Sequence, residues 1–190
     1  APLDVMVEVG DALHAAPLPA LLISLGSVQP WSIVAELHHR YGRSMVIGAG
    51  PIRDDAQMMA AIDAGAQFVM SGGYDAEIGE VCRRQGVLYV PCIHDAAHVR
   101  CALDADWRMV AFFPARRLGS ETLATLVRRF PSVRVIAAGG MNGENLGDYA
   151  RAGAAAVLVR GVLGARTKWR MNEVIVQMRR LRAAWDAASR

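Results

Sequence analysis

The sequence predicts a single α/β domain over residues 1–190, in which parallel strands alternate with helices. Seven short apolar runs recur along the chain, and such unbroken runs indicate strands buried on both faces, as in a parallel sheet covered by helices. Amphipathic segments with helix-capping residues separate them. The runs are LPALLIS (18–24), SMVIGAG (44–50), QFVMSGG (67–73), LYVPCI (88–93), RMVAFFPA (108–115), RVIAAGG (134–140) and AAVLVRG (155–161).

The segments between the runs have the pattern of helices. Residues 54–65 have apolar side chains on one side and end at Gly65, which suits a C-cap. Residues 121–130 follow Ser120, a candidate N-cap, and stop before a proline. The last segment, 166–190, predicts a long C-terminal helix, because its apolar residues recur at spacings of three and four.

Glycine or proline follows nearly every apolar run, which favours a closed (β/α)8 barrel of the TIM type. In such a barrel the strand ends and the loops after them form the mouth of the active site. The 190 residues allow about 24 per βα unit, against roughly 31 in a typical barrel. We therefore expect either a full barrel or one that is a βα unit short or irregular at the N-terminus. Residues 3–10 fit a first strand, which their alternating apolar residues favour, or the start of a leading helix. An open edge would need cover from the N-terminal segment or a neighbouring subunit.

Composition excludes several classes of protein. The 53% hydrophobic and 21% charged content is too apolar for a disordered chain. The sequence contains no run of eighteen uncharged apolar residues, so no membrane span is predicted. The first residues include acidic side chains and do not resemble a secretory signal. Three cysteines without CxxC spacing argue against a disulfide framework or a structural zinc site, so a reducing cytoplasm is expected. The basic C-terminal helix lacks aromatic interleaving, so no nucleic-acid partner is expected.

Five ordered motifs within residues 44–165 resemble those of the 2-keto-3-deoxy-6-phosphogluconate / 4-hydroxy-2-oxoglutarate aldolase family. The family carries GAGTV, AGAxFxVSP, GVxxxPG, KxFPA and FPxVxFxPTGGI. The corresponding segments here are GAGPI (48–52), AGAQFVMSGG (64–73), QGVLYVPCI (85–93), AFFPARRLG (111–119) and FPSVRVIAAGGMNGENLGDYARAGA (130–154). The resemblance implies a (β/α)8 barrel, usually a homotrimer. No cofactor is expected. It also implies an aldehyde-lyase that cleaves a 2-keto-4-hydroxy acid to pyruvate and an aldehyde through a lysine Schiff base.

The chain departs from the family where that chemistry occurs. Ala111 aligns with the Schiff-base lysine of KxFPA, and a methyl group cannot form an imine. The only lysine, Lys168, lies beyond the last predicted strand. The family glutamate and arginine of an EVTLRT-like strand fall on ISLGSV (23–28), which has neither. In a second alignment LPALLISLG matches the family's first strand, and a helix over 30–42 runs straight into SMVIGAG, with one βα unit deleted. In both alignments no carboxylate is offered for proton transfer. The catalytic residues are therefore unassigned, and we expect the family reaction to be lost.

Other family positions at the mouth also differ. The threonine of GAGTV is Pro51, the proline of VSP is Gly72 and the glycine of PG is Cys92. The predicted pocket residues are Gly50, Pro51, Ser71, Cys92, His94 and Phe113.

The loops after the last two strands predict a phosphate site, because barrels of this kind bind phosphate there through backbone N–H groups. The predicted residues are Gly139, Gly140, Arg160 and Gly161. The expected ligand is a small phosphorylated compound or a keto acid. In the alternative interpretation the glycines form tight turns and Arg160 blocks the former site.

His94 and His98, four residues apart, could both face a metal ion, with Cys92 or Asp95 as a third ligand. Asp95 is equally suited to cap a helix, and no metal site is predicted. The sequence leaves three interpretations of function. The first is an aldolase relative that has lost its original reaction, the second is a non-catalytic oligomeric binding or assembly module, and the third is a lyase with metal-assisted chemistry.

Overall fold

The computed structural model describes residues 3–160 and 170–189. The chain divides into two compact units, Ala1–Val90 with Arg170–Ile175 and Pro91–Trp169 with Val176–Arg190. Strand β4 (Leu88–Ile93) begins in the first unit and ends in the second. The single domain expected for residues 1–190 stays a prediction.

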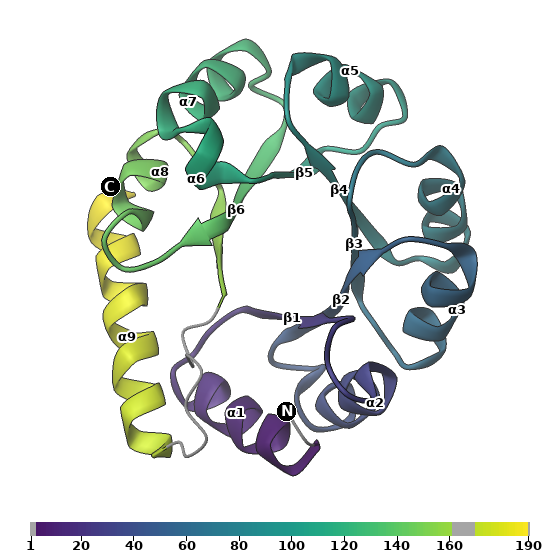
Figure 1. Cartoon of the computed structure of the whole chain (residues 1–190), viewed down its shortest axis with the longest axis vertical. Helices are drawn as coiled ribbons and strands as arrows, with labels where there is room; N and C mark the ends of the chain where they lie inside the picture. The colour runs from purple at the N-terminus through teal and green to yellow at the C-terminus, as the bar shows by residue number, and fades with distance from the viewer. Residues whose placement is uncertain (1–2, 161–169, 190) are drawn as a thin grey trace. The chain divides into compact units, whose positions relative to one another are not determined.

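The first unit alternates helices and parallel strands (Figure 1). Strand β1 pairs with β2, which pairs with β3, and the first residue of β4 donates its N–H to Gln67 at 3.2 Å. Spatial order therefore follows chain order. The elements are α1 (Leu3–Ala15), β1 (Ala20–Ser24), α2 (Pro30–Tyr41), β2 (Val46–Ile52), α3 (Asp55–Asp63), β3 (Phe68–Ser71), α4 (Ala76–Gln85) and the start of β4.

The N-terminal segment is a helix, so of the two alternatives left open for residues 3–10 the leading helix is confirmed and the first strand is wrong. Its buried positions, Val9, Ala12 and Leu13, follow helical spacing rather than strict alternation. Gly10 allows α1 to approach α2 closely, because a Cβ atom there would lie 2.6 Å from Leu37 Cδ2. The described residues accordingly hold seven strands, and β1 pairs directly with β2. Closure into a (β/α)8 barrel stays a prediction.

The second unit continues the same alternation. The end of β4 pairs with β5, β5 with β6 and β6 with β7, all in parallel. The elements that follow β4 are α5 (Ala96–Asp104), β5 (Met109–Phe112), α6 (Ala115–Leu118), α7 (Ser120–Arg129), β6 (Arg134–Met141), α8 (Leu146–Arg151), β7 (Ala156–Val159) and α9 (Met171–Ala188), of which residues 171–175 belong to the first unit.

Helix α9 is the C-terminal helix expected for 166–190, although residues 166–169 and 190 lie outside the described part of the chain. Its C-terminal part lies beside α8 (Figure 1), where a Cβ atom on Gly147 would be 3.5 Å from that of Ala188. No helix in the described ranges is both long and apolar enough to cross a membrane.

The helix ends differ from the expectations in two details. Gly65 follows the C-cap, Ala64, and takes the left-handed conformation with φ +88°. Ser120 is the first residue of α7 rather than its N-cap, which is Gly119.

Candidate functional site

The middle of β5 is apolar. Ala111 is completely buried, and its partners in the adjacent strands are Cys92 on β4 and Ile136 on β6. Burial raises the pKa of the Cys92 thiol to about 11, so it is protonated at neutral pH. This row of three residues therefore offers neither an amine nor an anionic nucleophile.

Gly139 and Gly140 form a bulge at the end of β6. The pairing with β7 passes from Ala138↔Leu158 directly to Met141↔Val159, so both glycines have no opposing residue in β7. Their φ angles are +91° and +80°, in the region that favours glycine.

Neighbouring side chains also require glycine in this bulge. A Cβ atom on Gly139 would lie 2.8 Å from the ring of Phe113, and one on Gly140 would lie 2.7 Å from Cβ of Arg116. The glycine pair is therefore explained by packing and backbone conformation, with or without a ligand.

Two asparagines fix the loop after the bulge. Asn145 donates its side-chain N–H to the carbonyl of Gly140 at 2.9 Å, and its side-chain oxygen accepts the backbone N–H of Asn142 at 2.9 Å. Asn142 in turn accepts the backbone N–H groups of Glu144 and Asn145. These bonds orient the peptide group that follows Gly140.

His94 lies beside Phe113, and a hydrogen bond joins the two residues. The carbonyl of Phe113 can only accept, so Nδ1 of His94 is the donor in their hydrogen bond. Nε2 of the neutral ring is then left as an acceptor. Both side chains are exposed, Phe113 to 43%.

Asp95 serves as the N-cap of α5. It accepts the backbone N–H groups of Ala97 and His98 at 2.8 and 3.1 Å, and Nδ1 of His98 lies 2.9 Å from the same oxygen. The backbone bond from His98 is the main cause that lowers the pKa of Asp95. The rings of His94 and His98 meet edge to face at 5.5 Å. Over residues 3–160 and 170–189, three or more His, Cys, Asp or Glu side chains nowhere gather as a metal site would require.

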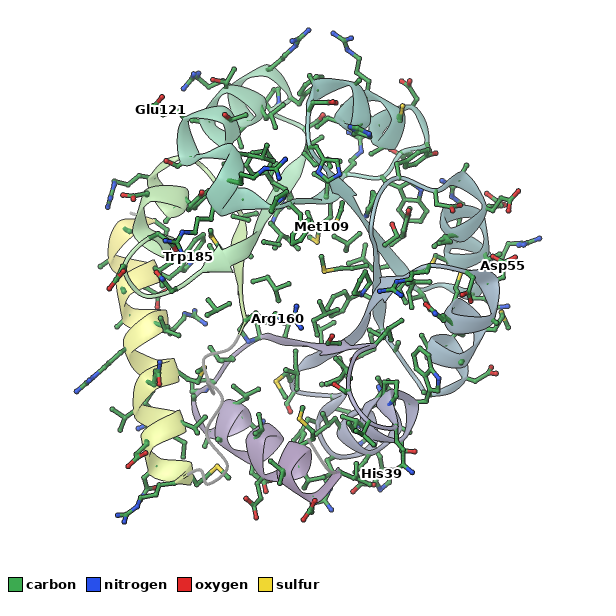
Figure 2. The ribbon with its side chains drawn as sticks, viewed as in Figure 1. His39, Asp55, Met109, Glu121, Arg160 and Trp185 are labelled. Atoms are coloured by element: carbon green, nitrogen blue, oxygen red, sulfur yellow. The ribbon has the colours of Figure 1, made fainter. Side chains whose placement is uncertain are left out.

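Arg116, on the short helix α6, is a candidate that the sequence analysis missed. Its exposed side chain lies along Gly140, and no carboxylate among the described residues pairs with it. The available signal was the pair of arginines directly after FPA in AFFPARR. Arg160 is exposed and directly follows β7 (Figure 2). Gly161 and Lys168 lie outside the described residues.

The remaining predicted pocket residues belong to the first unit. Gly50 and Pro51 lie at a register shift in β2, between the pairs Ala49↔Val69 and Ile52↔Ser71. Gly50 is buried, whereas Pro51 is exposed. A Cβ atom on Gly50 would lie 2.8 Å from the carbonyl oxygen of Met70, so this position has no room for a side chain.

Ser71 is engaged by its own loop. It is 2% exposed, bonds the hydroxyl of Tyr89 at 2.7 Å and donates to the carbonyl of Gly73. The grouping of all the predicted pocket residues into one pocket stays a prediction.

Strand β1 carries no ionisable side chain. Its sequence is ALLIS, and Ile23 is buried in it. The strand next to the GAG segment therefore supplies neither a general base nor a cationic group.

Parallel strands in chain order, joined by helices and with glycine bulges near their carboxyl ends, define an α/β protein with a TIM-like fold. The chain belongs to the KDPG and KHG aldolase family, whose model matches residues 3–178. This confirms the resemblance found in the sequence.

Individual relatives agree. The chain is 35% identical over 106 residues to a 2-dehydro-3-deoxy-phosphogluconate aldolase of Treponema pallidum, covering 55% of this chain and 50% of the relative. It is 30% identical over 145 residues to the enzyme of that name from Pseudomonas aeruginosa, covering 76% and 66%. The chain thus spans one half to about two thirds of these relatives.

Solved structures show the same fold. A 4-hydroxy-2-oxoglutarate aldolase/2-deydro-3-deoxyphosphogluconate aldolase from TTHB1 matches with a TM-score of 0.86 at 26% identity, over 95% of this chain and 88% of the other. A cube-shaped cage designed by fusing symmetric oligomeric domains matches with a TM-score of 0.89 at 25% identity, over 99% and 70%.

Proposed function

We propose that this protein is a KDPG/KHG-aldolase relative that has lost Schiff-base retro-aldol cleavage and still binds a small phosphorylated compound or keto acid. The observation that carries the proposal is the buried methyl group of Ala111, which the motif AFFPA aligns with the family lysine. Its strand neighbours, Cys92 and Ile136, offer no amine in its place. An imine cannot form without an amine.

The missing imine has a large energetic consequence. A Schiff base gives the electrons of the breaking carbon–carbon bond a cationic sink, and without it the enol must form against an uncharged ketone. Strand β1 also offers no carboxylate to move the proton. Removing a covalent nucleophile typically lowers turnover by several powers of ten.

Ligand binding does not depend on the lysine. Backbone N–H groups near Gly139 and Gly140, together with Arg160 and Gly161, would hold a phosphate group. The pocket residues Gly50, Pro51, Ser71, Cys92, His94 and Phe113 would surround the rest of the ligand.

The test is a coupled pyruvate-release assay on 2-keto-3-deoxy-6-phosphogluconate and 4-hydroxy-2-oxoglutarate, with and without added zinc or magnesium. We expect no turnover near ordinary enzyme rates, on the order of 1 per second. Turnover at that rate would overturn the proposal. Turnover that survives Lys168→Ala and disappears with a chelator would instead favour a metal-assisted lyase that uses His94 and His98.

The second candidate is a non-catalytic oligomeric module, supported by the similarity to the cage built from symmetric oligomeric domains. A homotrimer in the cytoplasm is part of both proposals. Ala111→Lys separates a merely inactivated aldolase from a chain whose pocket has also changed. Borohydride would trap pyruvate on the variant in the first case and fail in the second.

A further inference from the structure

Arg116 and the Gly139–Gly140 bulge together form a candidate anion site within the second unit. We propose that the guanidinium of Arg116 holds the phosphate group of the ligand at this bulge. The inference rests on the proposed function, in which a phosphorylated ligand is retained, and adds the side chain that recognises its charged end.

The side chain of Arg116 passes over Gly140. A Cβ atom on Gly140 would lie 2.7 Å from Cβ and 2.9 Å from Cδ of Arg116, so the aliphatic part of the arginine crosses this glycine. The guanidinium begins one bond beyond Cδ. The guanidinium is therefore close to the backbone of the bulge, which is not paired with β7. Glycine at these positions permits a ligand to approach the main chain.

The charge of Arg116 also favours an anion as its partner. Arg108 and Arg151 of this unit pair with the nearby carboxylates of Asp106 and Asp148, at 2.9 and 2.6 Å. No described carboxylate pairs with Arg116, although it is exposed and next to a second arginine. A guanidinium is always charged and matches two phosphate oxygens with parallel N–H bonds.

The backbone around Arg116 is held in place. The hydroxyl of Tyr149, on α8, donates to the carbonyl of Ala115 at 2.7 Å in a buried contact. The arginine stem packs on Gly140, so less side-chain freedom is lost when an anion binds. Arg117 has the same charge and is also exposed, but none of its atoms is among those nearest to a Cβ on Gly140, which makes it a matched control.

The experiment is titration calorimetry of the full chain with inorganic phosphate and, separately, with pyruvate. Arg116→Gln should weaken phosphate binding about tenfold or more, because charge-assisted hydrogen bonds are lost. Arg117→Gln should change it less than about twofold. Pyruvate binding should be unchanged by Arg116→Gln, since pyruvate has no phosphate group. Circular dichroism confirms that both variants fold.

Two results would overturn the inference in different ways. If the unmodified chain binds phosphate and the two variants lose equal affinity, or only pyruvate binding falls, Arg116 has no special role and the proposed function stands. If the unmodified chain binds neither phosphate nor pyruvate, the inference and the retained ligand binding of the proposed function both fail.

Discussion

Tyr89→Phe should destabilise the fold by removing the centre of the hydrogen-bonded cluster after β3. The buried hydroxyl of Tyr89 lies 2.7 Å from Ser71 Oγ, accepts the backbone N–H of Asp75 at 2.9 Å and lies 3.2 Å from the carbonyl oxygen of Gly73. Each of the two hydroxyls has only one hydrogen to donate, so these contacts cannot all form hydrogen bonds at once. The Tyr89 hydroxyl therefore makes about two hydrogen bonds at a time, one as donor or partner of Ser71 and one as acceptor from Asp75. At about 1 kcal/mol net for each bond, the free energy of unfolding should fall by about 2 kcal/mol.

Urea denaturation followed by circular dichroism measures this loss. With an m-value of about 2 kcal/mol per molar, the midpoint should fall by about 1 M. Tyr74→Phe is the control, because in the described part of the chain the Tyr74 hydroxyl makes no hydrogen bond. Its midpoint should move by less than about 0.3 M. Equal shifts in the two variants would refute the reasoning.

The same variant has a second readout in alkali. Burial raises the pKa of Tyr89 to about 12, partly opposed by the hydrogen bond with Ser71. An unfolded tyrosine titrates near about 10. Because the folded pKa is the higher one, the neutral hydroxyl stabilises the fold below pH about 10, and this contribution is lost as the pH rises through the folded value. The difference in stability between the unmodified chain and Tyr89→Phe should therefore shrink above pH about 10.

The remaining predictions concern the second unit. Gly139→Ala should cost about 1–3 kcal/mol in backbone strain and a further amount for displacing the ring of Phe113, whereas Gly119→Ala, with φ +87° and open space around it, should cost the strain alone. Equal urea midpoints for the two variants would contradict the packing argument. Asp95→Asn should make the free energy of unfolding depend less steeply on pH in acid. The pKa of Asp95 is lowered mainly by the backbone hydrogen bond from His98, so its carboxylate stabilises the fold above pH about 3.9 and this contribution is lost as the pH falls further. Unfolding curves at several pH values below 5 test this, and an unchanged acid limb would contradict it.

The strands were predictable because each is apolar over nearly its whole length. LYVPCI was expected at 88–93, and β4 occupies Leu88–Ile93. A strand buried on both faces by helices leaves a continuous signal that needs no knowledge of its neighbours. The family resemblance came from the same stretches, because its motifs lie at the ends of these strands.

The first element and the missed arginine show what the sequence does not contain. Val5, Val7 and Val9 alternate as in a strand, but packing of Val9, Ala12 and Leu13 decides for a helix. Such a choice depends on tertiary contacts rather than on local preference. The approach of Arg116 to Gly140 likewise follows from the pairing of β5 with β6, which sequence spacing alone does not give.

The glycine pair at the end of β6 has a structural explanation that does not depend on phosphate binding. Both glycines have positive φ, and a side chain on either would collide with Phe113 or Arg116. Packing therefore requires glycine at these positions even in a chain that binds nothing, so their presence alone does not support phosphate binding. Arg116 is different, because neither packing on Gly140 nor an ion pair among the described residues requires a charge at its end. A methionine of similar length would pack on the glycine equally well. The guanidinium is thus the feature that packing leaves unexplained, and its loss in Arg116→Gln is the change that distinguishes a retained anion site from a retained fold.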